Sequence, residues 1–594
     1  MPMRLVVGIT GRPARPSGYD QGATVSSDQF GLDITSPHGP LLHPDGTTTF
    51  RLWAPRPDQV ELVLDEETRP MQPVGQGWFA ARVPAGHGAR YGYRLDGNNL
   101  RPDPASRWQP DGVHERSRVF DPATLEWSPD EAGWRAPDLA GAVIYELHVG
   151  TFTPRRTLDA AAERLGALAD LGVTHVEIMP LTAFNGAYGW GYDGVLWYAV
   201  HEPYGGPAAF ARFVETAHRH GLAVILDVVY NHLGPSGNRM PDFGPYLTDT
   251  CHTPWGEALN LDGPQSDPVR AFIVGNALHW FTDFHVDALR LDAAHALIDT
   301  SSVHILTELA AATSRRSALL RRPLRLIAES NRNDPLTVTP REHGGQGLDA
   351  LWVDDLHHAI HTAVTREHEG YYVDYTGLPD VAAGYTRGFV LDGRYSRYRE
   401  RAVGAPLGEL PGHRLVACIQ NHDQIGNRAL GDRLTTLVDP ARLRVAVVLL
   451  CAAPTTPMLF MGEEYGETQP FQYFTSHPEP ELAETVRQGR AEEFVRFSAF
   501  AHAEVPDPQD PATLERSTRC VPNGPPPRRA GSGWRCGPTC CGCDASSPRW
   551  ATTGATAARG RPRRSPALVT GEPCACQAGP RRCSRAADPD PYRG

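Results

Sequence analysis

The sequence predicts an α/β chain whose main part is a (β/α)8 TIM barrel, preceded by a smaller immunoglobulin-like β-sandwich. From about residue 136, short apolar runs alternate with helix-like segments, as in a barrel of parallel strands. Several of these runs end on charged residues, which is where barrel enzymes place their active sites. Before residue 136, short alternating runs are separated by Pro and Gly, the pattern of a sandwich.

The length and composition are typical of a large multi-domain protein. The chain has 594 residues, enough for three domains, and 41% of them are hydrophobic. The net charge of −12 argues against nucleic acid and anionic membranes as partners. The N-terminal run L-V-V-G-I is too short for a signal-peptide core, and no run reaches membrane-spanning length. We therefore expect a soluble, cytoplasmic protein.

The first 135 residues divide into a flexible segment and the sandwich. Residues 1–29 are rich in Gly, Pro and Ser, which predicts a flexible segment. Residues 30–135 contain the strand candidates Phe50–Pro55, Val60–Leu64, Trp78–Val83 and Tyr91–Leu95. Trp53 and Trp78 in these runs could stack on sugar, but a tryptophan here is more often a core residue.

Residues 136–517 are predicted to form the barrel. Its first strands are Val143–Val149 and His175–Pro180, and Leu158–Leu171 between them carries apolar residues at helical spacing. Thr456–Met461 is predicted to be the eighth strand. Four further strand candidates end in polar clusters: Ala223–His232, Val286–His295, Leu324–Glu329 and Leu415–Asp423.

The candidate Val286–His295 carries the most informative pair, Arg290 and Asp292. Because they are two residues apart on a strand, both side chains lie on the same face. A guanidinium beside a carboxylate keeps that carboxylate ionised, as a nucleophile requires. A buried structural ion pair would have the same spacing, so the pair alone does not establish catalysis.

Three carboxylates, Asp292, Glu329 and Asp423, close three different strands. Each alone could cap a helix from a loop, but in a barrel these strand ends converge on the active site. Most glycosidases use two Asp or Glu side chains that flank the bond to be cleaved, one ionised and one protonated. Asp292 suits the nucleophile because of Arg290. Glu329 suits the acid because it follows apolar residues and has no basic neighbour before Arg332.

The four polar clusters, in this order, resemble the four signature regions of the α-amylase superfamily of glycoside hydrolases. The resemblance implies that Asp292 is the nucleophile, Glu329 the general acid/base and Asp423 a sugar-binding residue that stabilises the transition state. It also implies binding or supporting roles for a further set: Arg290 beside the nucleophile, His232 and His422 at the attacked glucose, Tyr192 stacked beneath it, His295 on the product side, and Asp227 and Asn231 in support.

Longer loop segments resemble one family within that superfamily, the malto-oligosyltrehalose trehalohydrolases. These segments include Tyr230–Asn238, Met461–Glu467 and Pro470–Leu482, and the resemblance extends from about Phe30 to Arg516. It implies hydrolysis of the α-1,4 bond next to a terminal trehalose unit by a retaining double displacement, without cofactor or metal. It also implies a malto-oligosyltrehalose synthase as pathway partner. The sandwich resembles the N-terminal domain of branching and debranching enzymes.

The residues alone indicate only a retaining barrel enzyme that acts on α-glucan. A glucan branching or debranching enzyme of the same superfamily is the alternative. A glucan-binding protein that no longer turns over is a further alternative, but its inactivity would have to come from a folding defect at the C-terminus, because the catalytic residues are intact. The remaining Glu and His residues near strand ends are interpreted as structural. Their spacing does not indicate a metal site. We expect Glu146, Glu463 and Glu464 to support the site, and His148, His201 and His279 to be hydrogen-bonded structural histidines.

The segment 518–594 differs from the rest of the chain. It holds 13 Arg against 4 acidic residues and eight of the 11 cysteines, and it has neither helical nor strand periodicity. Cys536–Cys543 could be a zinc ribbon, but no second ligand pair has the matching spacing, and a disulfide module conflicts with a cytoplasmic location. We expect an out-of-frame translation in place of the last barrel helix and the C-terminal β-domain of the resembled family. Sequencing the gene across the Ser517 codon tests this, and a confirmed frame would contradict it.

Overall fold

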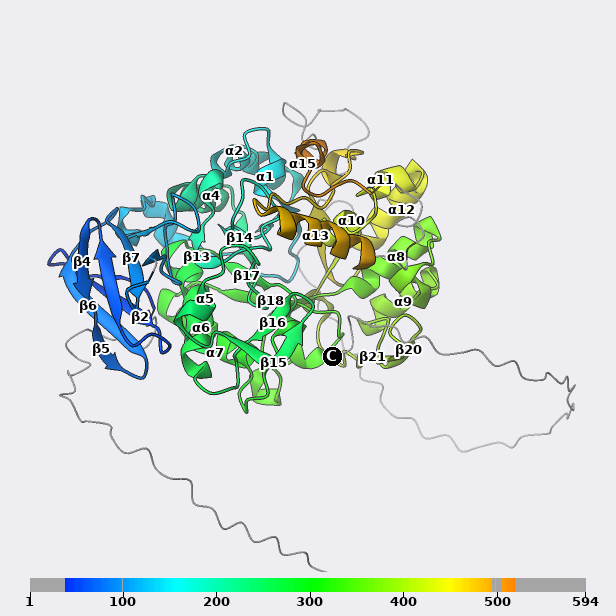
Figure 1. Cartoon of the computed structure of the whole chain (residues 1–594). Coiled ribbons are helices and arrows are strands. Elements are labelled where there is room, and N and C mark those ends of the chain that lie inside the picture. Colours follow the sequence, from blue (N-terminus) through cyan, green and yellow to red (C-terminus); the bar gives the residue numbers. More distant parts are fainter. Residues whose placement is uncertain (1–37, 99, 494–496, 498–504, 519–594) are drawn as a thin grey trace, which may run out of the picture.

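A computed structural model describes residues 38–98, 100–493, 497 and 505–518, which form a β-sandwich and a closed barrel packed side by side (Figure 1). The predicted flexible segment 1–29 lies outside the described residues. The predicted aberrant segment 518–594 also lies outside them, apart from Thr518. The expectations for these two segments, including the loss of the last barrel helix and the C-terminal β-domain, therefore remain predictions.

The sandwich consists of two antiparallel sheets, which confirms the predicted strands. One sheet has the order β1-β2-β6-β5, and the other has the order β4-β3-β7-β8 with β9 paired to β7. The strands are β1 (Leu41–Leu42), β2 (Thr47–Trp53), β3 (Val60–Leu64), β4 (Glu67–Pro70), β5 (Gln72–Gly75), β6 (Trp78–Pro84), β7 (Arg90–Leu95), β8 (Leu100–Arg101) and β9 (Ser117–Arg118). Trp53 is buried in the core and Trp78 is half-buried against it, as the core interpretation predicted.

The sandwich packs on the flank of the barrel through apolar and charged contacts. The ring of Trp53 lies 5.0 Å from that of Tyr246, which belongs to the barrel part. At the edge of this contact, Arg101 forms an ion pair of 2.6 Å with Asp242 in the short helix α5 (Met240–Phe243). The two parts share one continuous apolar core, so the sandwich is fixed against the barrel.

The barrel closes with eight parallel strands in chain order, which confirms the predicted fold class. The strands are β10 (Ile144–Leu147), β11 (His175–Ile178), β14 (Ala223–Val228), β17 (Ala288–Leu291), β18 (Arg325–Glu329), β19 (Ala350–Trp352), β22 (Leu415–Cys418) and β23 (Thr456–Phe460). Closure is made by β10 pairing with β23, with Ile144 opposite Met458. The sixth strand, β19, was not predicted from the sequence, because three residues carry no readable period.

Alternation along the strands builds an apolar layer inside the barrel and a charged layer above it. Ile144, Ile225, Ala288 and Ile327 belong to one buried apolar cluster inside the barrel. Side chains two residues apart on a strand share a face. The next inward positions on these four strands are therefore charged, and they are Glu146, Asp227, Arg290 and Glu329. The charged layer lies toward the carboxyl ends of the strands, where barrel active sites are found.

Helices cover the outside of the barrel (Figure 1). The longer ones are α4 (Gly206–Arg219), α6 (Ser266–Asp283), α7 (Ile305–Leu320), α8 (Asp354–Thr365), α9 (Leu378–Arg387), α12 (Pro440–Cys451), α13 (Pro480–Glu493) and α15 (Pro511–Thr518). The predicted single helix over Leu158–Leu171 is two helices, α2 (Leu158–Ala162) and α3 (Leu165–Leu171), because the chain makes a turn at Glu163. Within the described residues, no helix combines the length and apolarity needed to cross a membrane.

Short elements shape the loops at the carboxyl ends of the strands. They form three hairpins and four short helices: β12 (Thr182–Ala183) with β13 (Leu196–Val200), β15 (Leu247–Thr253) with β16 (Gly256–Leu259), β20 (Arg394–Ser396) with β21 (Arg401–Val403), and the helices α1 (Val149–Phe152), α5, α10 (His422–Gly426) and α11 (Leu434–Leu437). The loop between β12 and β13 carries Tyr192, and the turn between β15 and β16 carries Trp255.

Candidate active site

Arg290, on β17, is the centre of the charged layer. Its side chain is fully buried, and its Nη1 atom donates to both oxygens of Asp227, at 2.9 and 2.8 Å. The same Nη1 lies 2.8 Å from Oδ1 of Asp292, and Nη2 lies 3.5 Å from Oε2 of Glu329. The guanidinium also lies 4.4 Å from the centre of the Trp352 ring. One buried cation therefore binds two carboxylates and lies beside a third carboxyl group, and the three come from neighbouring strands.

Asp292 is held from both sides and remains partly exposed. Its Oδ1 accepts from Arg290, and its Oδ2 accepts from Nδ2 of Asn231 at 2.6 Å. The same Nδ2 donates to the backbone oxygen of Asp292 at 2.9 Å, which fixes the residue's main chain as well. The Asp292 side chain is 12% exposed. Its position just after β17 gives this carboxylate the fixed orientation that a nucleophile needs.

Glu329 ends β18 and has the electrostatics of a proton donor. Burial raises the pKa of Glu329 to about 8; Arg290 lowers this pKa, and the neighbouring Asp292 raises it. Its Oε2 accepts the backbone N–H of Ala293. A carboxyl group that keeps its proton at neutral pH can protonate a leaving oxygen.

The backbone directly after Asp292 is strained. Ala293, the residue after Asp292, has a φ of 37° and a left-handed conformation. This conformation presents its N–H to Glu329. Strain of this kind persists where the surroundings fix it, and it is frequent at active sites.

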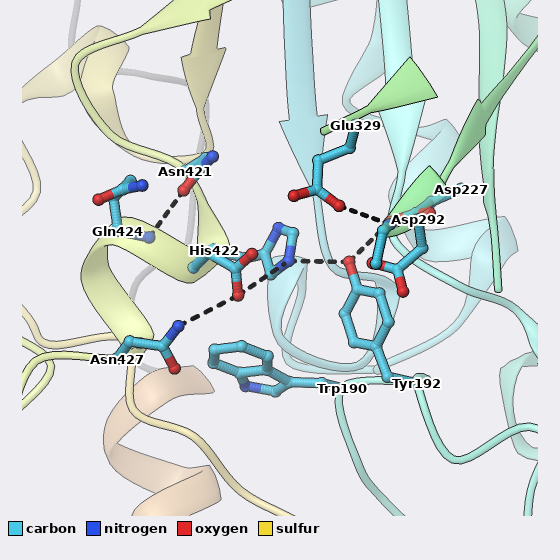
Figure 2. A network of polar contacts seen from close by, with 12 residues as sticks. Trp190, Tyr192, Asp227, Asp292, Glu329, Asn421, His422, Gln424 and Asn427 are labelled. Carbon is cyan, nitrogen blue, oxygen red and sulfur yellow. Dashed lines mark hydrogen bonds and ion pairs between the residues drawn. The ribbon is translucent and has the colours of Figure 1, made fainter. Parts of the chain in front are cut away.

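A second set of hydrogen bonds connects Asp227 to the opposite side of the site, where Tyr192 lies between Asp227 and His422 (Figure 2). The Tyr192 hydroxyl is 2.6 Å from Oδ2 of Asp227 and 2.8 Å from Nε2 of His422. Burial raises the pKa of Asp227 to about 6, and Arg290 opposes this rise. Asp227 is thus enclosed by Tyr192 and Arg290, which fits the supporting role that the resemblance implied.

Asp423 lies at the mouth of the site on α10, not directly at a strand end as the sequence suggested. The strand β22 ends at Cys418, and Asn421 then caps α10 by accepting the N–H of Gln424 at 2.7 Å. Asp423 is 43% exposed, and its Oδ1 lies 3.3 Å from Nδ2 of Asn427. Its exposure leaves this carboxylate free to accept hydrogen bonds from sugar hydroxyls.

His232 forms a side wall of the site together with an aromatic residue that the sequence analysis did not single out. Its Nε2 is 3.1 Å from the backbone oxygen of Tyr192, and its Nδ1 contacts Oδ1 of Asn231. Burial lowers the pKa of His232. The Trp255 ring stacks on His232 at 4.9 Å and is 49% exposed. A half-exposed tryptophan stacked on a site histidine offers a flat apolar surface of the kind on which a pyranose ring packs.

His295 follows Asp292 on η5 (Ala294–Ala296), near the base of Glu329. Burial lowers its pKa to about 4, and the nearby Arg332 lowers it further. Its Nδ1 has no hydrogen-bond partner among the described residues. The structure places His295 beside the carboxyl pair, and its predicted product-side contact remains a prediction.

The glutamates predicted to support the site lie beneath it or at its edge. Glu463 accepts from Gln420 at 2.6 Å, and Glu464 accepts from the Tyr145 hydroxyl at 2.8 Å. Glu146 is buried under His422 and accepts its backbone N–H at 3.0 Å. All three are held by protein groups, which agrees with the structural interpretation.

Two of the three predicted structural histidines have both ring nitrogens hydrogen-bonded. His148 contacts Thr151 and Gly189, and His279 contacts Asp283 and Tyr198. His201 is also a buried structural residue, but the expectation of a hydrogen bond was wrong for its Nε2, which has no partner among the described residues. Its ring instead stacks on Phe184 at 3.7 Å, and burial lowers its pKa to about 3.

Two residues of the site, and one buried residue beside it, were missed by sequence reasoning. Trp255 stands in a loop motif, but only the hairpin β15–β16 brings it to His232. Trp352 supports Arg290 from β19, the strand too short to be predicted. Glu177 is buried beside the charged layer, in register with Glu146 on the neighbouring strand. Alternation along the strand His175–Ile178 could have predicted that Glu177 lies on the face opposite to Val176 and Ile178.

The arrangement supplies an oriented carboxylate, a protonated carboxyl group and hydrogen-bonding groups for sugar hydroxyls. Among residues 38–98, 100–493, 497 and 505–518, no group of three or more His, Cys, Asp or Glu is placed to hold a metal ion. The side chains present are those that acid–base and nucleophilic chemistry at a glycosidic bond uses.

Comparisons with known proteins agree with this fold. Residues 30–122 match carbohydrate-binding module 48, the isoamylase N-terminal domain, and residues 151–240 match the alpha amylase catalytic domain. The chain is 54% identical over 474 residues to malto-oligosyltrehalose trehalohydrolase of Arthrobacter ramosus, covering 79% of this chain and 82% of that protein. It is 51% identical over 494 residues to the protein of that name from Rhizobium sp. (strain M-11), covering 82% of each. A Salmonella typhimurium protein solved at 1.4 Å as a candidate alpha amylase has a TM-score of 0.76 and 40% identity, covering 81% of this chain and 82% of that chain.

Proposed function

The chain belongs to the malto-oligosyltrehalose trehalohydrolase family and is a glycoside hydrolase, and we propose that it releases trehalose from malto-oligosyltrehalose. The bond cleaved is the α-1,4-glucosidic bond next to the terminal trehalose unit. The observation that carries the proposal is the unequal pair of carboxyl groups around Arg290. Asp292 accepts hydrogen bonds on both oxygens, whereas burial raises the pKa of Glu329 to about 8.

We infer a retaining double displacement. Asp292 attacks the anomeric carbon, while Glu329 gives its proton to the glycosidic oxygen and the trehalose leaves. The glycosyl–Asp292 ester is then attacked by water, from which Glu329 takes a proton, and the ester bond breaks. Both residues end in their starting states. Retention predicts that the two carboxyl groups lie about 5–5.5 Å apart.

The surrounding residues have roles that derive from their contacts. Arg290 orients Asp292 and Glu329 by its charge, with Asp227 and Asn231 holding the arrangement from behind. We assign to the remaining residues contacts with sugar, in the positions that the resemblance implied: Asp423, His422, Tyr192 and His232 at the attacked glucose, and His295 toward the released trehalose.

We also propose a place in a reaction sequence. The substrate carries a terminal trehalose, so an enzyme that converts the reducing end of an α-glucan into trehalose must act first. A malto-oligosyltrehalose synthase is the expected partner, and we expect both steps in the cytoplasm. The reaction as proposed draws only on side chains and water.

Incubation of the purified chain with maltotriosyl-trehalose and, separately, with amylose tests the proposal, with products separated by chromatography. We expect free trehalose from the first and little action on the second. An Asp292→Asn variant serves as the control for contaminating activity. New branch points, or debranching, would instead identify a different activity on the same barrel. A folded sample that binds glucan without forming product would contradict the proposal.

A further inference from the structure

Glu146 and His422 form a buried pair directly behind the sugar-binding groups. Glu146, on β10, is 1% exposed, and both of its oxygens face His422. Oε2 accepts the backbone N–H of His422 at 3.0 Å, and Oε1 contacts the ring at Nδ1. Strand β10 thus fixes the position and the ring plane of a residue on α10, which comes after β22 at the other side of the barrel closure.

Counting protons along the hydrogen bonds gives the charge state of His422. Asp227 accepts two hydrogen bonds from Arg290, so it is a carboxylate, and the Tyr192 hydroxyl donates its one proton to it. Toward His422, the Tyr192 oxygen can then only accept, which requires a proton on Nε2. On the other side, Nδ1 faces the carboxylate of Glu146, which requires a second proton. Both nitrogens are donors, so the ring is an imidazolium.

The charges around His422 favour that state. Burial alone disfavours the imidazolium, but Glu146 and Asp423 outweigh burial and raise the pKa of His422 to about 9. The titratable and charged groups that face the ring come from several elements: Glu146 and His148 at β10, Glu177 on β11, Tyr192 in the β12–β13 loop, Asp227 on β14, Arg290 on β17 and Asp423 on α10.

We propose that Glu146 is a positioning residue of the reaction, which acts by holding His422 as a doubly protonated hydrogen-bond donor. The charged ring donates to Tyr192 and lies 3.6 Å from Asp423, the two groups that the proposed function places at the attacked sugar. The inference rests on that proposed function for its catalytic meaning, but the charge state of His422 can be tested without it. Glu146 itself has no path to the substrate, because His422 covers both of its oxygens.

Glu177 provides a matched control. It lies opposite Glu146 on the neighbouring strand, is also 1% exposed, and has no hydrogen-bond partner for either oxygen among the described residues. Burial and the charge of Glu146 raise the pKa of Glu177 well above its ordinary value, which favours its neutral form. Glu177→Gln makes the same change of atoms in the same layer as Glu146→Gln, but at a side chain that has no hydrogen bond to His422.

The experiment compares the pH dependence of kcat/KM for the parent, Glu146→Gln and Glu177→Gln on maltotriosyl-trehalose. In Glu146→Gln, the pKa of His422 should fall from about 9 by about 1–3 pH units. Loss of the His422 proton should then set the alkaline limb in place of Glu329, which sets it near pH 8 in the parent, and the limb should move to lower pH by up to about 2 pH units. Glu177→Gln should keep the parent limb. Glu146→Asp, which restores the charge on a shorter side chain, should recover part of the shift. An alkaline limb that stays in place in Glu146→Gln would overturn the inference.

Histidine NMR on the full chain with labelled imidazole rings keeps the inference testable if Glu146→Gln fails to fold. The signal of His422 is assigned by its loss in His422→Gln. We expect both ring nitrogens to be protonated from pH 6 to pH 8. A neutral His422 at pH 7.5 would refute the inference even in an active enzyme. An imidazolium in a protein that releases no trehalose would leave the inference standing and contradict only the proposed function.

Discussion

The two ends of the barrel each hold a buried cluster of charges, and the two clusters are balanced differently. At the amino end, His218 on α4 lies between Glu131 and Asp287, with contacts of 2.9 and 2.8 Å, and Arg322 lies 3.2 Å from Asp287. Every carboxylate oxygen there has a donor. At the carboxyl end, Asp227, Asp292, Glu329, Asp423 and Glu146 outnumber the cations Arg290 and His422.

The pKa values separate the clusters by function. At the amino end, His218 and His285 outweigh the effect of burial and lower the pKa of Glu131 to about 2, which favours the charged form. At the carboxyl end, burial raises the pKa of Glu329 to about 8, which favours the neutral form. Paired charges stabilise the fold, whereas a carboxyl group forced toward neutrality costs stability and supplies a proton. One strand, β17, connects the two clusters, since Asp287 precedes it and Asp292 follows it.

The largest effect on activity should come from the unbalanced end. Asp292→Asn removes the proposed nucleophile while keeping the shape of the side chain, so we expect kcat/KM to fall about 10⁴-fold or more. Thermal unfolding should change little, and binding of maltotriosyl-trehalose should persist in calorimetry. Turnover at the parent rate would refute the assignment of the nucleophile.

Glu329→Gln should have the next largest effect. Loss of the general acid should lower the rate about 10²–10⁴-fold on maltotriosyl-trehalose. The loss should be much smaller in the first step with α-glucosyl fluoride, since fluoride leaves without a proton. In the parent, the acid is active below its pKa, so kcat/KM should decline as pH rises through about 8. Equal losses on both substrates would show that Glu329 is not the acid.

Glu131→Gln tests the balanced end, where stability should change and activity per folded molecule should not. The variant leaves His218 and His285 without their shared carboxylate, which should cost about 3 kcal/mol of unfolding free energy.

The stabilisation by Glu131 should also depend on pH. It is present above about pH 4.5 and is lost as pH falls toward 2. The pKa of His218 is raised, because Asp287 and Glu131 outweigh burial, so its contribution is present below pH 6.5 and is lost as pH rises. Urea unfolding should therefore show the largest gap between variant and parent from about pH 4.5 to 6.5.

The same comparison shows how far the sequence could predict this molecule. Arg290 and Asp292 stand in one short motif, and strand alternation alone brings them to one face. The amino-end cluster has no such signal, because Glu131, His218 and Arg322 come from distant segments that meet only when the barrel closes. The position of Asp423 was missed by a few residues because Asn421 starts a helix after β22 ends. Local sequence patterns predict which side chains of one strand share a face. Contacts between distant segments depend on the tertiary fold and have no such pattern.

The smallest effect concerns the strained backbone at Ala293, at the carboxyl end of the barrel. Ala293→Gly removes the penalty of a left-handed alanine, about 1–2 kcal/mol. Glycine loses more conformational entropy on folding than alanine, which costs about 0.5–1 kcal/mol of stability. The net change should be a gain of about 0–1.5 kcal/mol. Arg321 ends α7 in the same conformation, with a φ of 53°, far from the site, and Arg321→Gly is the matched control. If strain at Ala293 serves to present its N–H to Glu329, both variants should gain stability and only Ala293→Gly should lose activity. Equal activity in the two variants would mean that the carboxyl end tolerates this strain without using it.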